Sequence, residues 1–167
     1  MAHPRPTSHL TFREMTPDDI EAVAALLGDP DVMAYYPRPK TRAEALAWIA
    51  WNGRLYREHG HGLWLLEHAT TGEFVGDCGL TFQEVGGRME VEIGYHVRRS
   101  LQGRGYATEA ALAVRDFARD VLGLHRLVAI IDPGNAPSRR VAQRIGLTFE
   151  QEVGWSGKRV LVYAGPI

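Results

Sequence analysis

The chain is nearly free of cysteine, since Cys78 is the only one among its 167 residues. A single cysteine excludes an internal disulfide and is typical of a protein that works in a reducing compartment. Long apolar runs are also missing, because no stretch approaches the roughly 20 residues of a membrane-spanning helix. Basic charge is not in excess: 19 Lys and Arg face 20 Asp and Glu, for a formal net charge of -1. We therefore expect neither a membrane nor a nucleic acid as a partner.

What the chain does contain is ordinary for a globular protein. Apolar residues make up 45% of it and charged residues 23%. At this length we expect a single domain over residues 1–167 with a sizeable buried core. The N-terminal MAHPRPTSH lacks the apolar segment of a signal peptide, so we expect a cytoplasmic protein. We expect no metal site, because His59 and His61 have no supporting cysteine or carboxylate pattern.

Hydrophobic spacing and turn residues predict one mixed α/β sheet. Thr41 and Glu44 form the capping box of a helix start, and residues 127–131 are a continuous apolar run, typical of a strand buried on both faces. The expected elements are strand 10–13, a helix from Thr16 to Gly28, a helix from Thr41 weakened near its end by Gly53, strands 63–67, 74–82 and 89–97, helix 107–122, strand 127–131, helix 135–145, and two strands flanking 155–158. This βααβββαβαββ order is a mostly antiparallel sheet with one parallel strand–helix–strand crossover.

A glycine-rich segment, Gln102-Gly103-Arg104-Gly105-Tyr106-Ala107, lies between an expected strand and an alanine-rich helix. Helix N-termini carry unpaired N–H groups and partial positive charge, so such a segment can hold a phosphate. A dinucleotide-binding turn is one interpretation, but Thr108 stands where its third glycine would be. A purely structural helix start is the second. The third is the spacing Gln/Arg-x-x-Gly-x-Gly/Ala, and the flanking elements favour it.

Three local features together resemble the GNAT acetyltransferase superfamily over essentially the whole chain. They are Glu92-Ile93-Gly94-Tyr95, the glycine loop, and Asn135-Ala136-Pro137-Ser138 followed by Gly146-Leu147. The loop and the Asn-x-x-Ser motif lie about thirty residues apart, with one expected helix and strand between them. The chain looks most similar to the branch that includes the ribosomal-protein N-terminal (alanine/serine) acetyltransferases. The resemblance implies the GNAT fold and transfer of an acetyl group from acetyl-coenzyme A (acetyl-CoA) directly to a primary amine.

The resemblance also implies where acetyl-CoA binds. Backbone N–H groups of the loop would hold the pyrophosphate, the main chain near Val97 and Arg99 would pair with the pantetheine arm, and Asn135 would contact that arm. The implied coenzyme-binding residues are Val97, Arg99, Gln102, Gly103, Arg104, Gly105, Tyr106, Ala107, Thr108 and Asn135. Several N–H donors at a helix N-terminus do suit a diphosphate.

Glu92 is our candidate for the general base. The reaction needs one, because amines with pKa values of about 8 to 10.4 are largely protonated near neutral pH. Strand alternation puts Glu90, Glu92 and His96 on one face, and repulsion between the two carboxylates would raise the pKa of at least one. A solvated surface pair of carboxylates is the competing interpretation, and we take His96 as structural or as a bystander.

Ser138 is our candidate for the acid that protonates the departing thiolate. Many family members use a tyrosine seven residues after the asparagine, and Ala142 stands there in this chain. The branch with Asn-x-x-Ser is thought to use the serine, which implies Ser138. First-turn hydrogen bonding in the helix is the alternative role for Ser138, and water could replace it as the acid.

The acceptor side of the site is the least specific part of the sequence. Tyr35 and Tyr36, in the loop between the first two helices, are our candidate substrate-binding residues, because loops carry specificity. Four other aromatic residues could wall the same pocket but are more often core: Trp48, Trp51, Trp64 and Trp155. The acceptor could be a protein N-terminus, an amino acid, a polyamine or an antibiotic amine, and a homodimer stays open. A non-catalytic acyl-CoA-binding or sensing module is the alternative function.

Overall fold

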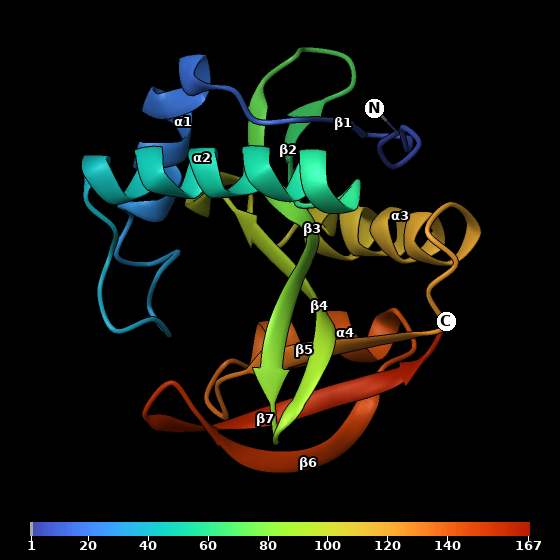
Figure 1. Ribbon diagram of the computed structural model, residues 1–167. Helices are drawn as coiled ribbons and strands as arrows, with labels where there is room; N and C mark the ends of the chain where they lie inside the picture. Colours follow the sequence, from blue (N-terminus) through green and yellow to red (C-terminus); the bar gives the residue numbers. More distant parts are fainter. Residues whose placement is uncertain (1) are drawn as a thin grey trace.

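The computed structural model describes residues 2–167, so Met1 of the expected domain lies outside the described residues. The strands are β1 (Leu10–Arg13), β2 (Leu63–His68), β3 (Phe74–Val85), β4 (Arg88–Val97), β5 (Arg126–Ile131), β6 (Thr148–Trp155) and β7 (Lys158–Pro166). The helices are α1 (Ile20–Leu27), α2 (Arg42–His59), α3 (Tyr106–Asp120) and α4 (Ala136–Arg144), and the 3₁₀ turns Pro17–Asp19 and Arg99–Leu101 precede α1 and α3. The predicted βααβββαβαββ order is confirmed (Figure 1).

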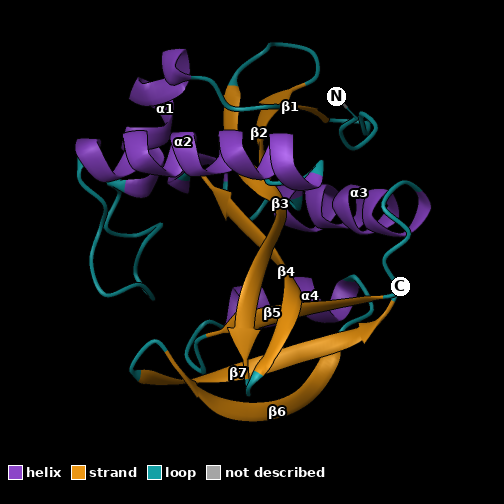
Figure 2. Ribbon diagram, in the orientation of Figure 1, coloured by secondary structure: helices purple, strands orange, loops and turns teal. Residues whose placement is uncertain are grey.

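The seven strands form one sheet in the order β1-β2-β3-β4-β5-β7-β6. Neighbouring strands are antiparallel except β4 and β5, which confirms the single predicted crossover through α3. This parallel pair meets at one register position, where Glu92 lies beside Val128. Beyond it β4 stays paired with β3 as far as Val97, but no described strand pairs with its other side. β4 and β5 therefore diverge toward their C-terminal ends (Figure 2).

Two apolar cores lie on opposite faces of this sheet. Figure 1 shows α1 and α2 on the near face and the fainter α3 and α4 behind the strands. Alternation along β2 divides its side chains between them: Trp64 and Leu66 pack in the core under α3, whereas Leu63 and Leu65 pack in the core under α1 and α2. The face of α3 that meets the sheet is buried and contains three alanines beside the larger Val114 and Phe117: Ala110, Ala111 and Ala118. Small side chains let that helix approach the strands closely.

A smaller core ties the β3–β4 hairpin to the C-terminal strands. Val85, beside the hairpin turn, packs against Val128, Val162 and Ala164 of β5 and β7. The turn itself is Gly86-Gly87, and both glycines have left-handed φ angles, of +57° and +77°. A two-residue turn of this kind sets the register of the hairpin, and with it the neighbours of every residue in β4.

Helix α2 differs from the prediction at its end. It does not weaken at Gly53 but continues to His59 and stops at Gly60, whose φ of +72° is left-handed. Buried residues on both sides of Gly53, including Asn52 and Tyr56, hold this part of the helix in place. Tertiary packing therefore outweighs the cost of about 1 kcal/mol for a glycine inside a helix. No helix within residues 2–167 is long and apolar enough to span a membrane.

Candidate active site

The glycine loop leads into the N-terminus of α3. Gly103 and Gly105 have left-handed φ angles of +76° and +85°, and a Cβ at either position would meet no atom within 4 Å. Gly105 is the N-cap, and its carbonyl accepts the first helical hydrogen bond from the N–H of Glu109 at 3.0 Å. Within residues 2–167 no acceptor reaches the N–H groups of residues 105 to 108. Open space beside unpaired amide donors at a helix N-terminus suits an anion.

The other implied coenzyme residues surround this loop. The Gln102 side chain donates from Nε2 to the Val97 carbonyl at 3.0 Å, so a ligand that pairs with that carbonyl shares it with Gln102 or displaces it. Arg99 lies in a 3₁₀ turn rather than in a strand, and its side chain pairs with Asp31 at 2.6 Å. Arg104 is exposed, and the first turn of α3 contains the half-buried Tyr106, Ala107 and Thr108.

Glu92 lies at the one point where β4 and β5 pair. It faces Thr81 across the β3–β4 ladder, and Thr81 Oγ1 donates to Glu92 Oε2 at 3.2 Å. Burial raises the pKa of Glu92 to about 7, although hydrogen bonds from Thr81 and Gln83 and the nearby His96 oppose the shift. A carboxyl that titrates near pH 7 can both accept and release a proton there, as a general base must.

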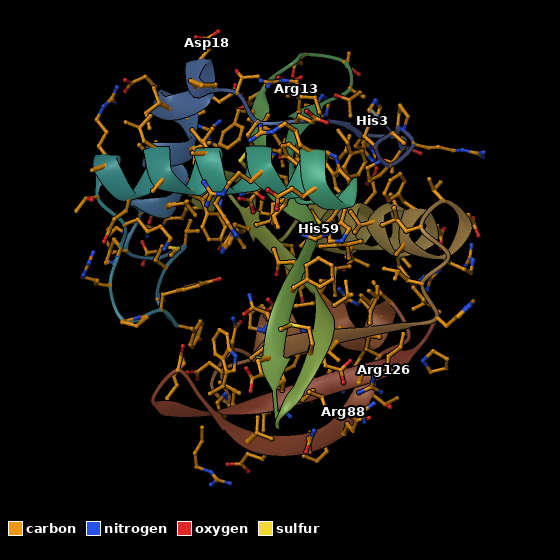
Figure 3. The ribbon with its side chains drawn as sticks, in the orientation of Figure 1. His3, Arg13, Asp18, His59, Arg88 and Arg126 are labelled. Carbon is orange, nitrogen blue, oxygen red and sulfur yellow. The ribbon has the colours of Figure 1, made fainter. Side chains whose placement is uncertain are left out.

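We predicted that repulsion between Glu90 and Glu92 would raise the pKa of at least one of them. For Glu92 that prediction is wrong, because its pKa is raised by another cause. Arg126 binds Glu90 through two nitrogens, at 3.1 and 3.2 Å, and it also binds Glu150 at 2.8 Å (Figure 3 labels Arg126). The guanidinium neutralises Glu90, so desolvation of the Glu92 carboxyl is what raises its pKa. Arg126 begins β5, and nothing local in the sequence indicates that it pairs with a residue of β4.

Ser138 lies in the first turn of α4 and contacts Tyr95 of β4. Tyr95 Oη donates to the Ser138 backbone carbonyl at 2.9 Å and lies 3.0 Å from Ser138 Oγ. The phenol has one proton and gives it to the carbonyl, so the serine hydroxyl donates in the second contact. Asn135 caps the helix, because its Oδ1 accepts from the Ser138 N–H at 3.2 Å. The Ser138 hydroxyl is therefore not the cap.

Tyr95 is a candidate site residue to which the sequence analysis gave no role. Burial raises its pKa, so its phenol stays protonated and keeps Ser138 Oγ in place through their 3.0 Å contact. The sequence held one hint of this role. Position 142 is alanine where many family members have tyrosine, which suggests that a tyrosine on a neighbouring element takes its place. Ala142 itself is fully buried, which leaves that position to packing.

The loop that carries Tyr35 and Tyr36 is fixed across the end of the sheet. Tyr35 Oη donates to the Gly134 carbonyl at 3.1 Å. Lys158 Nζ donates to the Tyr35 backbone carbonyl at 2.6 Å and pairs with Asp132 at 3.0 Å. The loop therefore reaches from α1 to the residues that follow β5 and begin β7, close to where β4 and β5 diverge.

Tyr36 meets a buried pair that the sequence analysis did not identify. Its Oη lies 2.7 Å from His96 Nε2, and His96 Nδ1 lies 2.7 Å from Asp77 Oδ1. His96 and Asp77 face each other in the β3–β4 register, and both are buried. Trp48 is the other aromatic residue near this pair, with its ring centroid 6.3 Å from that of His96. The remaining tryptophans pack elsewhere, in the cores or along α2: Trp51, Trp64 and Trp155. Among the described residues no group of three or more His, Cys, Asp or Glu could hold a metal ion.

The comparisons with known proteins agree on one family. The model of the acetyltransferase (GNAT) domain matches residues 9–148. The YkkB protein of Bacillus subtilis (strain 168) is 37% identical over 158 residues, which cover 94% of this chain and 92% of YkkB. The N-acetyltransferase YnaD of the same organism is 32% identical over 145 residues, which cover 86% of this chain and 82% of YnaD.

Solved structures share the fold over nearly the whole chain. An acetyltransferase from Agrobacterium tumefaciens str. C58 superposes with a TM-score of 0.86 at 28% identity, covering 99% of this chain and 95% of that one. RimL, a ribosomal L7/L12 α-N-protein acetyltransferase in complex with coenzyme A, superposes with a TM-score of 0.77 at 19% identity over 96% of each chain. The predicted fold is confirmed, and the ribosomal-protein branch is among the proteins that share it.

Proposed function

The chain belongs to the GNAT acetyltransferase family, and from that premise we propose that it is an N-acetyltransferase that moves the acetyl group of acetyl-CoA directly to a primary amine. Glu92 is the observation that carries this proposal. It is a carboxyl with a pKa of about 7, placed where β4 and β5 begin to diverge. One domain, residues 1–167, performs the whole reaction in the cytoplasm, where the lone buried thiol of Cys78 stays reduced.

The glycine loop binds the coenzyme in this proposal. The N–H groups of residues 105 to 108 hold the pyrophosphate, and Arg104 adds positive charge beside them. The pantetheine arm runs along the unpaired side of β4 toward Glu92, past Val97 and Asn135. The complex of RimL with coenzyme A supports coenzyme A as the ligand, since RimL shares the fold.

The proposed reaction needs a base at one end of the thioester and an acid at the other. Glu92 takes a proton from the attacking nitrogen, directly or through water, and the nitrogen forms a bond to the thioester carbon. The C–S bond breaks, and Ser138 Oγ, with the Tyr95 phenol beside it, gives a proton to the departing sulfur. Tyr35 and Tyr36 hold the acceptor amine, which is a protein N-terminus or a small-molecule amine.

A second candidate function is a non-catalytic acyl-CoA-binding or sensing module. The buried Ala142, where many family members have a tyrosine, favours it. A screen for thiol release from acetyl-CoA, run against amines and N-terminal peptides, separates the two. Release with at least one acceptor supports the transferase, whereas tight coenzyme binding without release for any acceptor supports the module.

Replacing Ser138 with alanine should lower kcat by up to about 10²-fold, near the low end for acid catalysis because a thiolate leaves readily. Affinity for acetyl-CoA should change little, since the proton is donated in the transition state. Thermal stability should also hold, because Asn135 caps α4. Asn135→Ala is the matched comparison, with an expected loss of about 1 kcal/mol in the free energy of unfolding. Wild-type kcat in Ser138→Ala at every pH would end the serine assignment.

Replacing Lys158 with methionine should raise the KM for the acceptor several-fold while leaving affinity for acetyl-CoA unchanged. The change removes both contacts that tie the loop of Tyr35 to Asp132 and so loosens only the acceptor side. Arg159→Met is the control, because Arg159 is on the same strand and makes only an exposed ion pair with Glu152. Steady-state kinetics with each substrate varied in turn gives the answer, and an unchanged acceptor KM would remove the loop from the acceptor site.

A further inference from the structure

Three polar side chains form a continuous hydrogen-bonded chain that includes His96, which lies on the same strand as Glu92. Tyr36 Oη, His96 Nε2, His96 Nδ1 and Asp77 Oδ1 follow one another with two contacts of 2.7 Å. Only 8% of His96 and 1% of Asp77 are exposed, so the inner end of the chain is shielded from water. Its outer end is the Tyr36 phenol. Tyr36 as a whole is 45% exposed, but its hydroxyl end is enclosed, and the pKa of the phenol is raised by that burial and then by the charges of Glu92 and Asp77. We call these three residues the Tyr36–His96–Asp77 chain.

The inner end of this chain is arranged to hold positive charge. Asp77 Oδ2 is buried and has no hydrogen-bond partner in the described chain. An unpaired buried carboxylate oxygen is costly, and a cation next to the carboxylate offsets that cost. Among residues 2–167, the side chain hydrogen-bonded to Asp77 is that of His96, which gains a positive charge when its ring is protonated.

The reaction itself needs two proton acceptors. An acceptor that arrives as an ammonium ion carries three protons on nitrogen, and the amide product keeps one. One proton must leave before the nitrogen can attack and another as the amide forms. Glu92 can hold only one of them at a time, and the thiolate receives its own proton from the other side of the thioester.

This inference rests on the proposed function. We propose that the Tyr36–His96–Asp77 chain is a proton relay for acceptors that bind as ammonium ions. The relay takes the first proton from the nitrogen, and Glu92 takes the second. The ammonium N–H gives its proton to Tyr36 Oη as the phenol proton passes to His96 Nε2. The products are a neutral amine, a neutral Tyr36 and an imidazolium paired with Asp77. The imidazolium later returns its proton to solvent through Tyr36.

The charges around His96 set the pH range of the relay. Burial lowers the pKa of His96, but its pKa is raised overall because Asp77 outweighs burial; Glu92 also raises it, and Lys40 lowers it. The relay accepts a proton only while His96 is neutral, so its contribution grows as the pH rises through the pKa of His96. The substrate class follows: strongly basic alkyl amines, which need the first deprotonation most.

A series of acceptors of constant size tests the relay. Ethylamine and its mono-, di- and trifluorinated analogues become stepwise weaker bases, so more of each is already neutral at the assay pH. For His96→Gln, we expect kcat/KM relative to wild type to fall along the series as the share of the amine that is ammonium at the assay pH rises. The weakest base should react equally well with both proteins. His61→Gln, at another buried histidine, whose Nδ1 lies 3.0 Å from the Leu80 carbonyl and whose ring packs beside Phe82, should follow wild type throughout.

The outcomes separate the relay from the proposed function. Wild-type turnover with no such slope in His96→Gln overturns the relay and leaves the transferase standing. If the wild-type protein releases no thiol with any amine, including N-terminal peptides, the proposed acetyltransferase activity is overturned. NMR titration of the His96 ring tests the link between His96 and Asp77 independently of enzyme activity. Asp77→Asn should lower the pKa of His96, and an unchanged pKa overturns the relay. Thermal unfolding of each variant confirms that folded protein is compared.

Discussion

Replacing Gly105 with valine is expected to abolish measurable acetyl-CoA binding while the sheet and its cores stay folded. The valine side chain would fill space that is open around Gly105 and would block the amide donors at the start of α3. Loss of two charge-assisted hydrogen bonds, at about 1.5–3 kcal/mol each, weakens binding by roughly 10²–10⁴-fold. Calorimetric titration with acetyl-CoA measures this directly.

Gly123→Val is the matched control for backbone strain. Gly123 follows α3 at its other end, has a left-handed φ of +66°, and also has open space around it. Valine at either position costs about 1–3 kcal/mol of stability because an L-residue is strained there. Both variants should therefore unfold at similarly lowered temperatures, and only Gly105→Val should lose the coenzyme. Unchanged affinity in Gly105→Val would remove the pyrophosphate from this loop.

Replacing Glu92 with glutamine should lower kcat/KM by about 10²–10⁴-fold near neutral pH, the usual contribution of a general base. The wild-type pH profile should show the same group. A base works only when it is unprotonated, and the pKa of Glu92 is raised to about 7, so activity should rise as the pH passes through 7 and fall below it. Glutamine cannot titrate, and the rise that belongs to Glu92 should disappear from the variant.

Glu90→Gln tests whether the effect belongs to Glu92 alone. Glu90 is two residues away on the same strand, but Arg126 binds its carboxylate. The variant should change stability by about 1 kcal/mol or less, since the ion pair is partly exposed, and should keep the inflection near pH 7. With trifluoroethylamine, the acceptor that does not need the relay, an inflection that survives in Glu92→Gln, or a small loss of kcat/KM in that variant, would return Glu92 to a structural role.

The elements of the fold could be read from the sequence because each has a local signal. The capping box of Thr41 and Glu44 marks the start of α2, and the apolar run 127–131 marks a strand buried on both faces. The end of α2 could not be read in this way. Gly53 opposes a helix locally, and the packing of Tyr56 in the core decides the outcome.

The site was only partly predictable, because its contacts join residues far apart in the chain. Strand alternation places Glu92 and His96 on one face of β4, but it does not show which residues of β3 lie opposite. The two-glycine turn at 86–87 held that information, since it pairs Thr81 with Glu92 and Asp77 with His96. The contacts of Tyr36 with His96 and of Arg126 with Glu90 depend on a loop and a strand whose positions no local pattern encodes.

Acetyl transfer is tested most directly by mass spectrometry of an acceptor incubated with acetyl-CoA, with free thiol measured in the same sample. We expect every acetylated amine to be matched by one released thiol with the wild-type protein, and both products to fall together in Glu92→Gln. Thiol release without an acetylated amine would contradict transfer to nitrogen. Tight binding of acetyl-CoA with neither product, across amines and N-terminal peptides, would contradict an enzyme and favour the sensing module.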